Sequence, residues 1–342
     1  MIFKSKRLSG LFLIVCIFFS CNNNDIPNVS NIRVDLKVQR FEKDLFSIDT
    51  NNILPGLQRL RNEYPVFIND FTGQILGFNP STPPDTLTKY VHLFIRDYRF
   101  VKDSADKVFG DFEPQIKEIK KGLQFVKYYF PAYKFPGKVI TFIGPFDGYS
   151  DVLTTDAFAI GLQLHMGSNF TFYNSGIAQD LFPGYIVQKF TPQYIPVNCI
   201  KNIIDDMFPD RSTGKALIEQ MVEKGKGLYL LDKFLPYTPE YIKIGYTEKQ
   251  LKDSYINEAV IWDFFLNNAL LNSGDQNIVK NYIGESPKTQ ELGEGSPGNI
   301  GAFSGWQIVK KYMGKNSKTT LPELMKIDTR EIYNQSKYKP RS

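Results

Sequence analysis

Residues 1–21 have the pattern of an export signal, and this feature constrains the rest of the chain most strongly. Three basic residues within the first seven positions precede an apolar run over residues 8–19, and Cys21 follows Ser20. An apolar run of about a dozen residues is typical of a secretory signal and is too short to span a bilayer comfortably. The pattern therefore predicts that residues 1–20 are removed and that the mature chain folds outside the cytoplasm.

The position of Cys21 directly after the apolar run predicts a lipoprotein signal. In such a signal the thiol is acylated before cleavage, and the mature N-terminus is held at a membrane by the attached lipid. Phe18 and Phe19 depart from the Leu-Ala-like residues that usually precede such a cysteine. The alternative is an ordinary cleaved signal with an accidental cysteine. We expect lipid attachment at Cys21 and a location in the cell envelope, membrane-anchored on the periplasmic side.

Cysteine content indicates that the fold is held by its core alone. Of the three cysteines, Cys16 leaves with the signal, Cys21 takes the lipid and only Cys199 remains, so no disulfide forms. A mature chain of roughly 320 residues buries about three quarters of its unfolded surface. The polar, turn-rich residues 21–33 are expected to be a flexible tether, and residues 34–342 are expected to be a single domain.

The net charge of the chain argues against nucleic acid as a partner. Residues 1–20 hold Lys4, Lys6, Arg7 and no acidic residue, so their removal lowers the formal net charge from +5 to +2. A nearly neutral chain lacks the basic excess of nucleic-acid-binding proteins. We expect no nucleic acid among the partners.

Apolar periodicity predicts an α+β fold, a mostly helical body with a small mixed β-sheet. An alternating stretch at 34–41, a β-branched run at 139–144 and two short segments within 151–164 favour strands. Thr247 and Gln250 have the spacing of a capping box and predict that a helix begins there. The expected helices are 54–64, 87–98, 112–129, 196–208, 212–234, 247–268 and 300–313.

Two histidines limit the metal and nucleophile chemistry available. His92 lies on a predicted helix, and His165 ends an apolar segment. Neither belongs to a local metal-binding motif, and the chain has no nucleophile elbow. Cys199 is expected on the inner face of its helix, where a buried thiol is inert. The preferred interpretation is two partly buried imidazoles with ordinary hydrogen bonds; the alternative is a site made in space by both histidines and a carboxylate.

Carboxylates are the remaining candidates for catalysis. Several gather near the predicted sheet, and Glu258 interrupts the apolar segment 257–262. A buried glutamate needs a partner, and a structural salt bridge is the preferred interpretation over a functional role. Asp205 and Asp206 are adjacent on a helix and point about 100° apart, so they do not form a catalytic pair. The carboxylates near the sheet are Asp147, Asp151, Asp156 and Asp180.

Small residues give the predicted helix 300–313 one smooth face. Gly301 and Gly305, with Ala302 and Ser304, allow another element to approach its backbone closely. The preferred interpretation is a tightly packed core helix; a binding groove is the alternative. The loops 144–148 and 295–298 are turn-forming and lack the lysine and the strand–loop–helix context of a phosphate-binding loop.

Residues 295–313 read Gly-Ser-Pro-Gly-Asn-Ile-Gly-Ala-Phe-Ser-Gly-Trp-Gln-Ile-Val-Lys-Lys-Tyr-Met. This segment resembles the C-terminal signature of the gliding-motility lipoprotein GldB family of Bacteroidetes-type bacteria. The resemblance begins at the lipidated start and covers nearly the whole mature chain. The other matching segments are 181–183, 191–195, 225–232, 244–262 and 336–340.

The resemblance implies both a fold and a role. Members of the family are accessory components that work with other gliding motility (Gld) envelope proteins to move adhesins along the cell surface. Their fold is similar to that of zincin-type peptidases, whose metal helix carries H-E-x-x-H. When residues 198–202 are aligned with this motif, Asn198 and Asn202 stand at the histidine positions and Cys199 at the glutamate position. The zinc ligands and the catalytic base are then absent. Glu258 would then be a remnant of an outer ligand.

The leading hypothesis is therefore a lipid-anchored accessory protein of the gliding machinery. It is expected to act by protein–protein interaction, with no catalytic residue, no cofactor and no metal. The rival hypothesis is an envelope enzyme, either a zincin-like metal-dependent peptidase or a carboxylate-based hydrolase that uses Glu258 and Asp156. A weaker third alternative, a glycan- or substrate-binding lipoprotein, is suggested only by the 28 Phe and 19 Tyr, most of which are expected in the core.

Overall fold

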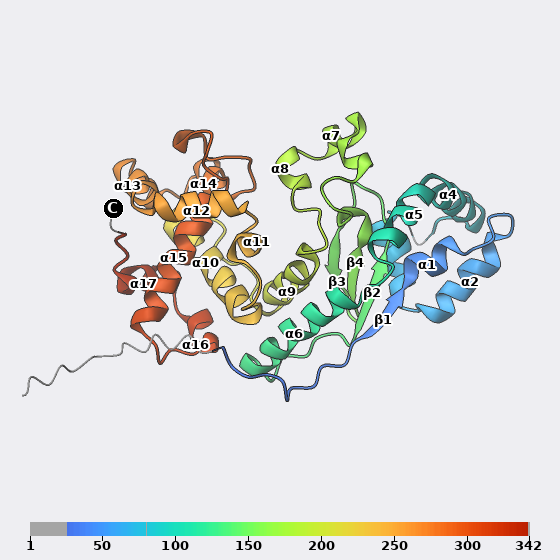
Figure 1. Ribbon diagram of the computed structural model, residues 1–342, viewed down its shortest axis with the longest axis horizontal. Helices are drawn as coiled ribbons and strands as arrows, with labels where there is room; N and C mark the ends of the chain where they lie inside the picture. Colours follow the sequence, from blue (N-terminus) through green and yellow to red (C-terminus); the bar gives the residue numbers. More distant parts are fainter. Residues whose placement is uncertain (1–25, 80, 341–342) are drawn as a thin grey trace, which may run out of the picture.

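A four-stranded mixed sheet organises the first half of the chain (Figure 1). The strand order is β1-β2-β4-β3; β1, β2 and β4 are parallel, and β3 runs antiparallel to β4. β4 is buried along its whole length and β2 along four of its five residues, which is typical of parallel strands covered on both faces. The strands are β1 (Lys37–Arg40), β2 (Lys138–Phe142), β3 (Asp151–Leu153) and β4 (Phe158–Gly161).

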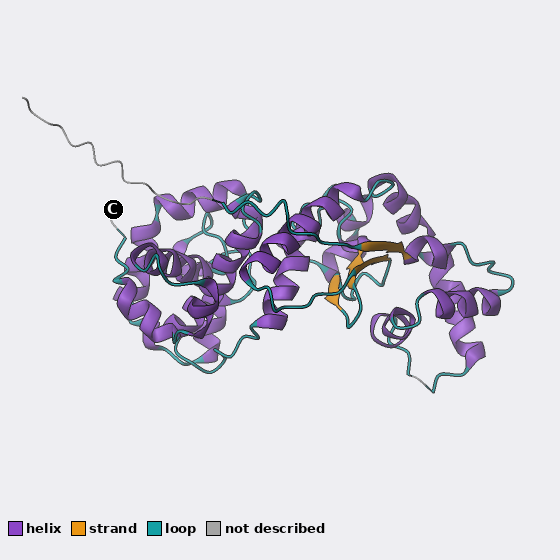
Figure 2. Ribbon diagram, turned by 90° about the horizontal axis from the view of Figure 1, so that it is seen from below, coloured by secondary structure: helices purple, strands orange, loops and turns teal. Residues whose placement is uncertain are grey.

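The computed structural model describes residues 26–79 and 81–340. Helices make up most of this part, so the predicted α+β class is confirmed (Figure 2). The helices between β1 and β2 are α1 (Phe41–Phe46), α2 (Ile53–Glu63), α3 (Phe67–Asp70), η1 (Phe71–Ile75), α4 (Pro84–Asp97), α5 (Arg99–Val108) and α6 (Glu113–Tyr129). The four short helices that follow β4 are η2 (Leu162–Leu164), η3 (Thr171–Asn174), α7 (Gly176–Leu181) and α8 (Gly184–Val187).

In the second half of the chain, up to residue 340, every regular element is a helix. Its first long helices are α9 (Tyr194–Met207) and α10 (Leu217–Phe234). The remaining helices are α11 (Glu240–Ile244), α12 (Glu248–Ile256), α13 (Glu258–Asn267), η4 (Leu270–Asn272), α14 (Gln276–Ile283), η5 (Gln290–Leu292), α15 (Ile300–Lys315), α16 (Leu321–Lys326) and α17 (Thr329–Ser336).

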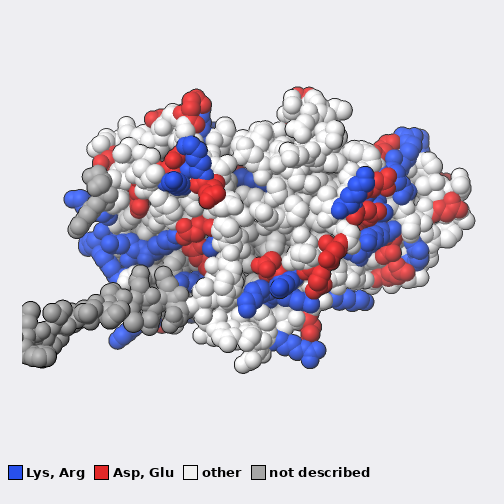
Figure 3. Space-filling model, viewed as in Figure 1, with Lys and Arg blue, Asp and Glu red and all other residues white. Residues whose placement is uncertain are grey.

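Two hydrophobic cores lie side by side along the long axis (Figure 1). The first surrounds the sheet and is rich in phenylalanine, with Phe41, Phe67 and Phe142 among its fully buried rings. The second lies around α10 and α15. α10 belongs to both, because its N-terminal half packs in the second core and its last turns pack in the first. On the face seen in Figure 3, basic and acidic residues are intermixed toward the two sides and leave a broad uncharged area in the upper middle.

The closest packing in the second core is the crossing of α10 and α15. A Cβ on Gly305 would overlap the carbonyl oxygen of Met221, and one on Gly225 would overlap the backbone of Gly305. Trp306 is fully buried beside this crossing. The interpretation of residues 300–313 as a tightly packed core helix is therefore confirmed.

Three predicted boundaries are corrected by local geometry. The alternating stretch 34–41 forms a strand only over β1, because Phe41 turns inward to begin α1. α10 begins at Leu217 rather than at residue 212, because Gly214 has a positive φ and Ser212 bonds back to Asp210. The helix capped by Thr247 stops at Asn257, whose side chain bonds to the carbonyl oxygen of Asp253, and α13 follows as a separate helix.

The predicted signal, Cys21 and the start of the predicted tether lie outside the described residues. Within residues 26–33, Val29 is fully buried in the first core, so the end of the predicted tether packs against the body. In the described part of the chain no helix is both long and apolar enough to span a membrane.

Candidate functional site

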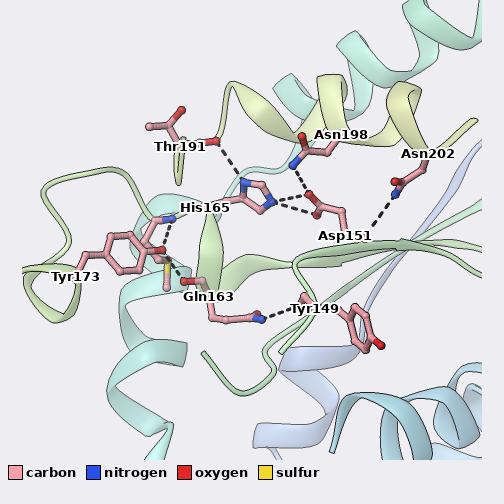
Figure 4. A network of polar contacts seen from close by, with 9 residues as sticks. Tyr149, Asp151, Gln163, His165, Tyr173, Thr191, Asn198 and Asn202 are labelled. Carbon is pink, nitrogen blue, oxygen red and sulfur yellow. Dashed lines mark hydrogen bonds and ion pairs between the residues drawn. The ribbon is translucent and has the colours of Figure 1, made fainter. Parts of the chain in front are cut away.

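The carboxylate of Asp151 is the centre of a buried polar network between β3 and α9 (Figure 4). His165 Nε2 lies 3.0 Å from Asp151 Oδ1 and 2.9 Å from Oδ2. Asn198 Nδ2 donates to Oδ2 at 2.6 Å. Asn202 Nδ2 donates to the backbone carbonyl oxygen of Asp151 at 3.3 Å. Three segments that are distant in sequence therefore meet at one acidic residue.

Local structure explains why these side chains converge. Asp151 begins the edge strand β3, and α9 packs against that strand. Asn198 and Asn202 are four residues apart on α9, so they occupy one face of the helix and reach the same strand. His165 follows the short helix η2 directly after β4, the neighbour of β3 in the sheet.

Both ring nitrogens of His165 face hydrogen-bond acceptors. Nδ1 lies 3.3 Å from the carbonyl oxygen of Thr191, and Nε2 faces the Asp151 carboxylate. The ring is therefore held between β3 and the segment that precedes α9, and Asn198 donates to the same carboxylate from α9.

A second set of hydrogen bonds fixes the loops beside this pair. The side chain of Gln163 accepts from the backbone N–H of Gly144 at 3.0 Å and donates to the carbonyl oxygen of Tyr149 at 3.2 Å. The hydroxyl of Tyr173 donates to the carbonyl oxygen of Gln163 at 2.5 Å, and burial raises the pKa of Tyr173. These bonds hold the two loops at the ends of β2 and β4 together.

The centre of the network is buried, whereas Asn198 and Asn202 at its edge are partly exposed. The side chains of Asp151 and His165 are each 2% exposed, and the lone pairs of Asp151 face donors from His165 and Asn198. A buried carboxylate and imidazole that bond to each other are poorly placed to reach a substrate. The arrangement suits a structural clamp between β3 and α9.

Cys199 lies next to Asn198 on α9 and is buried, as predicted. Burial, with a smaller contribution from the Asp151 carboxylate, raises the pKa of its thiol well above the ordinary value. Because the thiolate is the reactive form, this environment leaves the thiol inert.

The other candidate residues are dispersed. His92 Nδ1 lies 3.1 Å from the carbonyl oxygen of Thr50, so it does not meet His165. Asp156 accepts from Lys138 on β2 at 2.9 Å. Asp147, Asp180, Asp205 and Asp206 are exposed and join no site with them.

Glu258 has a different partner from the one expected. Tyr338 donates its hydroxyl proton to Glu258 Oε1 at 2.6 Å. The preferred interpretation of a structural salt bridge is therefore wrong, because the partner is a phenol and not a cation. Glu258 begins α13 in the helical half, far along the chain and the molecule from the sheet beside Asp156 (Figure 1).

Among the described residues, no group of three or more histidine, cysteine, aspartate or glutamate side chains is placed to hold a metal ion. Asn198 and Asn202, the positions that the family resemblance aligns with zinc ligands, are both donors to Asp151. An amide that donates its N–H protons to a carboxylate and a carbonyl is not arranged as a metal ligand.

Sequence reasoning named Asp151 and His165 separately but did not pair them. The available signal was the two asparagines four residues apart on one face of the helix, because such amides need a polar partner when they pack against another element. Which strand supplies that partner is decided by the packing of α9 against β3, which the sequence pattern does not contain.

A comparison with family models matches residues 22–340 to the model described as gliding motility protein GldB. The chain belongs to the GldB family. The predicted resemblance is thereby confirmed, and the family indicates a gliding motility protein, consistent with the cell envelope. No curated protein and no solved structure matches the chain. The zincin-like part of the resemblance has no support from these comparisons.

Proposed function

We propose that this GldB-family protein is a lipid-anchored accessory component of the gliding machinery that acts by binding other motility proteins. The observation that carries the proposal is the family match over residues 22–340. The lipid is attached at Cys21, and the body stands on the periplasmic side of the membrane that holds the lipid. The sequence pattern around Cys21 supports this anchor.

The arrangement around Asp151 supports binding over catalysis. Asn198 and Asn202, the positions aligned with a metal site, instead each donate a hydrogen bond to Asp151, whose side chain is buried. Since a general acid or base must reach its substrate, a carboxylate enclosed by its own partners is poorly placed for that role. In this proposal the zincin-like helix α9 persists as a structural element whose former ligand positions tie it to β3.

α10 supports the interpretation of residues 34–342 as one domain. Leu217 and Met221 pack in the second core, whereas Leu231 and Phe234 pack in the first. A single helix that contributes fully buried side chains to both cores couples their unfolding.

Deletion of the gene followed by complementation tests the proposal. We expect the deletion to abolish colony spreading and the movement of surface-bound beads, and the wild-type gene to restore both. A Cys21→Ala variant is expected to lose lipid labelling and to restore movement poorly. Normal bead movement in the deletion strain would contradict the motility role, and persistent lipid labelling of the variant would contradict the anchor.

Crosslinking in intact cells separates binding from catalysis. We expect the wild-type protein to be recovered covalently linked to another envelope protein of the motility machinery. The rival enzyme hypothesis, a metal-dependent peptidase or a carboxylate-based hydrolase, has no need of a lasting partner. Recovery of the protein free of any crosslinked partner, together with metal-dependent peptide cleavage by the purified chain, would favour the rival.

A further inference from the structure

The folded body begins close to the predicted lipid anchor, because the chain enters the first core a few residues after Cys21. Val29 is fully buried in that core, and the backbone N–H of Ile32 donates to the carbonyl oxygen of Val29 at 3.0 Å. Eight residue steps separate Cys21 from Val29. An extended chain spans at most about 3.6 Å per residue, so these steps reach no further than about 29 Å. A lipid at Cys21 therefore keeps Val29 within that distance of the membrane.

Two hydrogen bonds show which part of the body lies beside this attachment point. Gln124 Nε2 donates to the carbonyl oxygen of Ile32 at 2.8 Å, and Lys127 Nζ donates to that of Arg33 at 3.4 Å. Both donors lie in the C-terminal half of α6. The N-terminal segment, blue in Figure 1, runs along the bottom of the molecule beside this end of α6. We call the surface made by residues 26–33 and 127–134 the N-terminal face.

The N-terminal face exposes large apolar and aromatic side chains. Ile26 is 44% exposed and Tyr128 is 48% exposed. Directly after Tyr128, residues 129–133 line an open hollow of about 480 Å³. Among the described residues that line it, Asp206 is the one charged residue, and it accepts a hydrogen bond from the Tyr133 hydroxyl at 2.6 Å. Tyrosine rings and apolar side chains of this kind favour the interface between a bilayer and water.

The charges of this face are few and nearly balanced. The charged residues in its two segments are Arg33, Lys127 and Lys134. Arg33 pairs with Asp35 at 2.7 Å, and Asp206 in the hollow offsets a further positive charge. An exposed lysine can rest its aliphatic stem on apolar surface while its ammonium stays among the lipid headgroups. The chemistry therefore suits contact with a bilayer surface and does not require anionic lipid.

We propose that the N-terminal face lies against the membrane that carries the lipid, with Ile26, Tyr128 and the open hollow at the depth of the headgroups. This inference rests on the proposed lipid at Cys21 and adds an orientation of the body to it. The short reach of the chain brings the face to the membrane surface, and its apolar side chains keep it there. The helices at the top of Figure 1, α7 and α14, then point away from the membrane, where other motility proteins can reach them.

Fluorescent probes on opposite sides of the body test this orientation. A bimane label is attached at Lys134→Cys on the N-terminal face or at Lys280→Cys on α14, both exposed lysine positions; Cys199 is buried and does not compete for the label. The full lipidated chain is placed on neutral phosphatidylcholine vesicles whose headgroups carry nitroxide quenchers. We expect at least threefold stronger quenching at residue 134 than at residue 280. Equal quenching, or stronger quenching at residue 280, would overturn the proposal.

Charge substitutions separate contact with the bilayer from simple proximity to it. Ile26→Glu/Tyr128→Glu places two carboxylates on the N-terminal face and is expected to lower quenching at residue 134 at least twofold. Ile177→Glu/Leu181→Glu is the matched control, because both positions are exposed on α7, and it is expected to leave the quenching unchanged. Unchanged quenching in the first variant would show that the short chain alone keeps the face near the membrane and would reject the contact.

Flotation of the same vesicles distinguishes failure of the orientation from failure of the anchor. We expect both labelled proteins to float with the vesicles, because the lipid at Cys21 carries them. Absence of flotation would overturn the anchor and this orientation with it. Flotation together with equal quenching at residues 134 and 280 would leave the anchor in place and overturn the orientation alone.

Discussion

Gly225 on α10 and Gly305 on α15 approach so closely that a Cβ on Gly225 would overlap the backbone of Gly305. Two helices can cross at this separation only where both lack side chains. The contact brings Trp306 Nε1 within 2.8 Å of Asp232 Oδ2, to which it donates. This crossing therefore determines how the second core is assembled.

Gly305→Ala is expected to destabilise the protein by about 2–4 kcal/mol, because the added methyl group forces the two backbones apart. Gly314→Ala, in the same helix with open space around it, is expected to be neutral or stabilising by up to about 1 kcal/mol. Urea unfolding of both variants provides the measurement. Similar stability of the two would contradict the close-packing account.

The Asp151 carboxylate accepts the hydrogen bonds of the network, and substitution of this residue tests that direction. Asp151→Asn replaces an acceptor with a group that presents N–H protons to the donors of Asn198 and His165, so a loss of about 2–4 kcal/mol is expected. The double variant Asp151→Asn/Asn198→Asp restores a donor opposite an acceptor and is expected to recover part of that loss. Thermal and urea unfolding measure the stability of both variants. A double variant no more stable than Asp151→Asn would argue against this pairing.

The thiol of Cys199 is expected to be unreactive in the folded protein. Its burial and raised pKa keep it as a protected thiol at pH 8. An aromatic disulfide reagent should label Cys199 at least a hundredfold more slowly in the native chain than in urea. Fast labelling under native conditions would indicate that α9 opens readily or that the thiol is activated.

Lys201 makes stability depend on pH in a defined direction. Its pKa falls from 10.5 to about 8 on folding, so between these values the unfolded chain binds more protons and stability rises with pH. Below pH 8 the full cost of desolvating the partly buried ammonium is present. Lys201→Met is therefore expected to be more stable than the wild type at pH 7, by about 1–2 kcal/mol after discounting for solvent screening. Urea unfolding at pH 7 and 9.5 measures the difference in unfolding free energy between Lys201→Met and the wild type, which is expected to narrow at pH 9.5. A difference that stayed constant or widened would contradict a lowered pKa of Lys201.

Local signals predicted the elements that depend on neighbouring residues. The β-branched run of Val139, Ile140 and Thr141 became β2, and the capping box of Thr247 and Gln250 formed as expected. The small-residue face of α15 correctly predicted a close helix contact. In each case the physical cause, such as β-branching, capping or the absence of a side chain, lies within a few residues.

Partners that are distant in sequence were not predictable in the same way. Asn198 is 47 positions from Asp151, and Tyr338 is 80 positions from Glu258. Choosing the right partner requires the packing of α9 on β3 and the position of the C-terminal segment beside α13.

The central claim, function by binding rather than by catalysis, is tested most directly by removing both carboxylates of the rival hydrolase. An Asp156→Asn/Glu258→Gln variant loses its carboxylates at two partly exposed positions and is expected to fold. The side-chain partners are Lys138 and Thr154 for Asp156 and Tyr338 for Glu258, and an amide oxygen can still accept from them. Surface-bead movement would be compared in cells that carry equal amounts of lipidated wild-type and variant protein. We predict the same bead velocity in both; loss of movement with a folded, anchored variant would contradict a purely binding role.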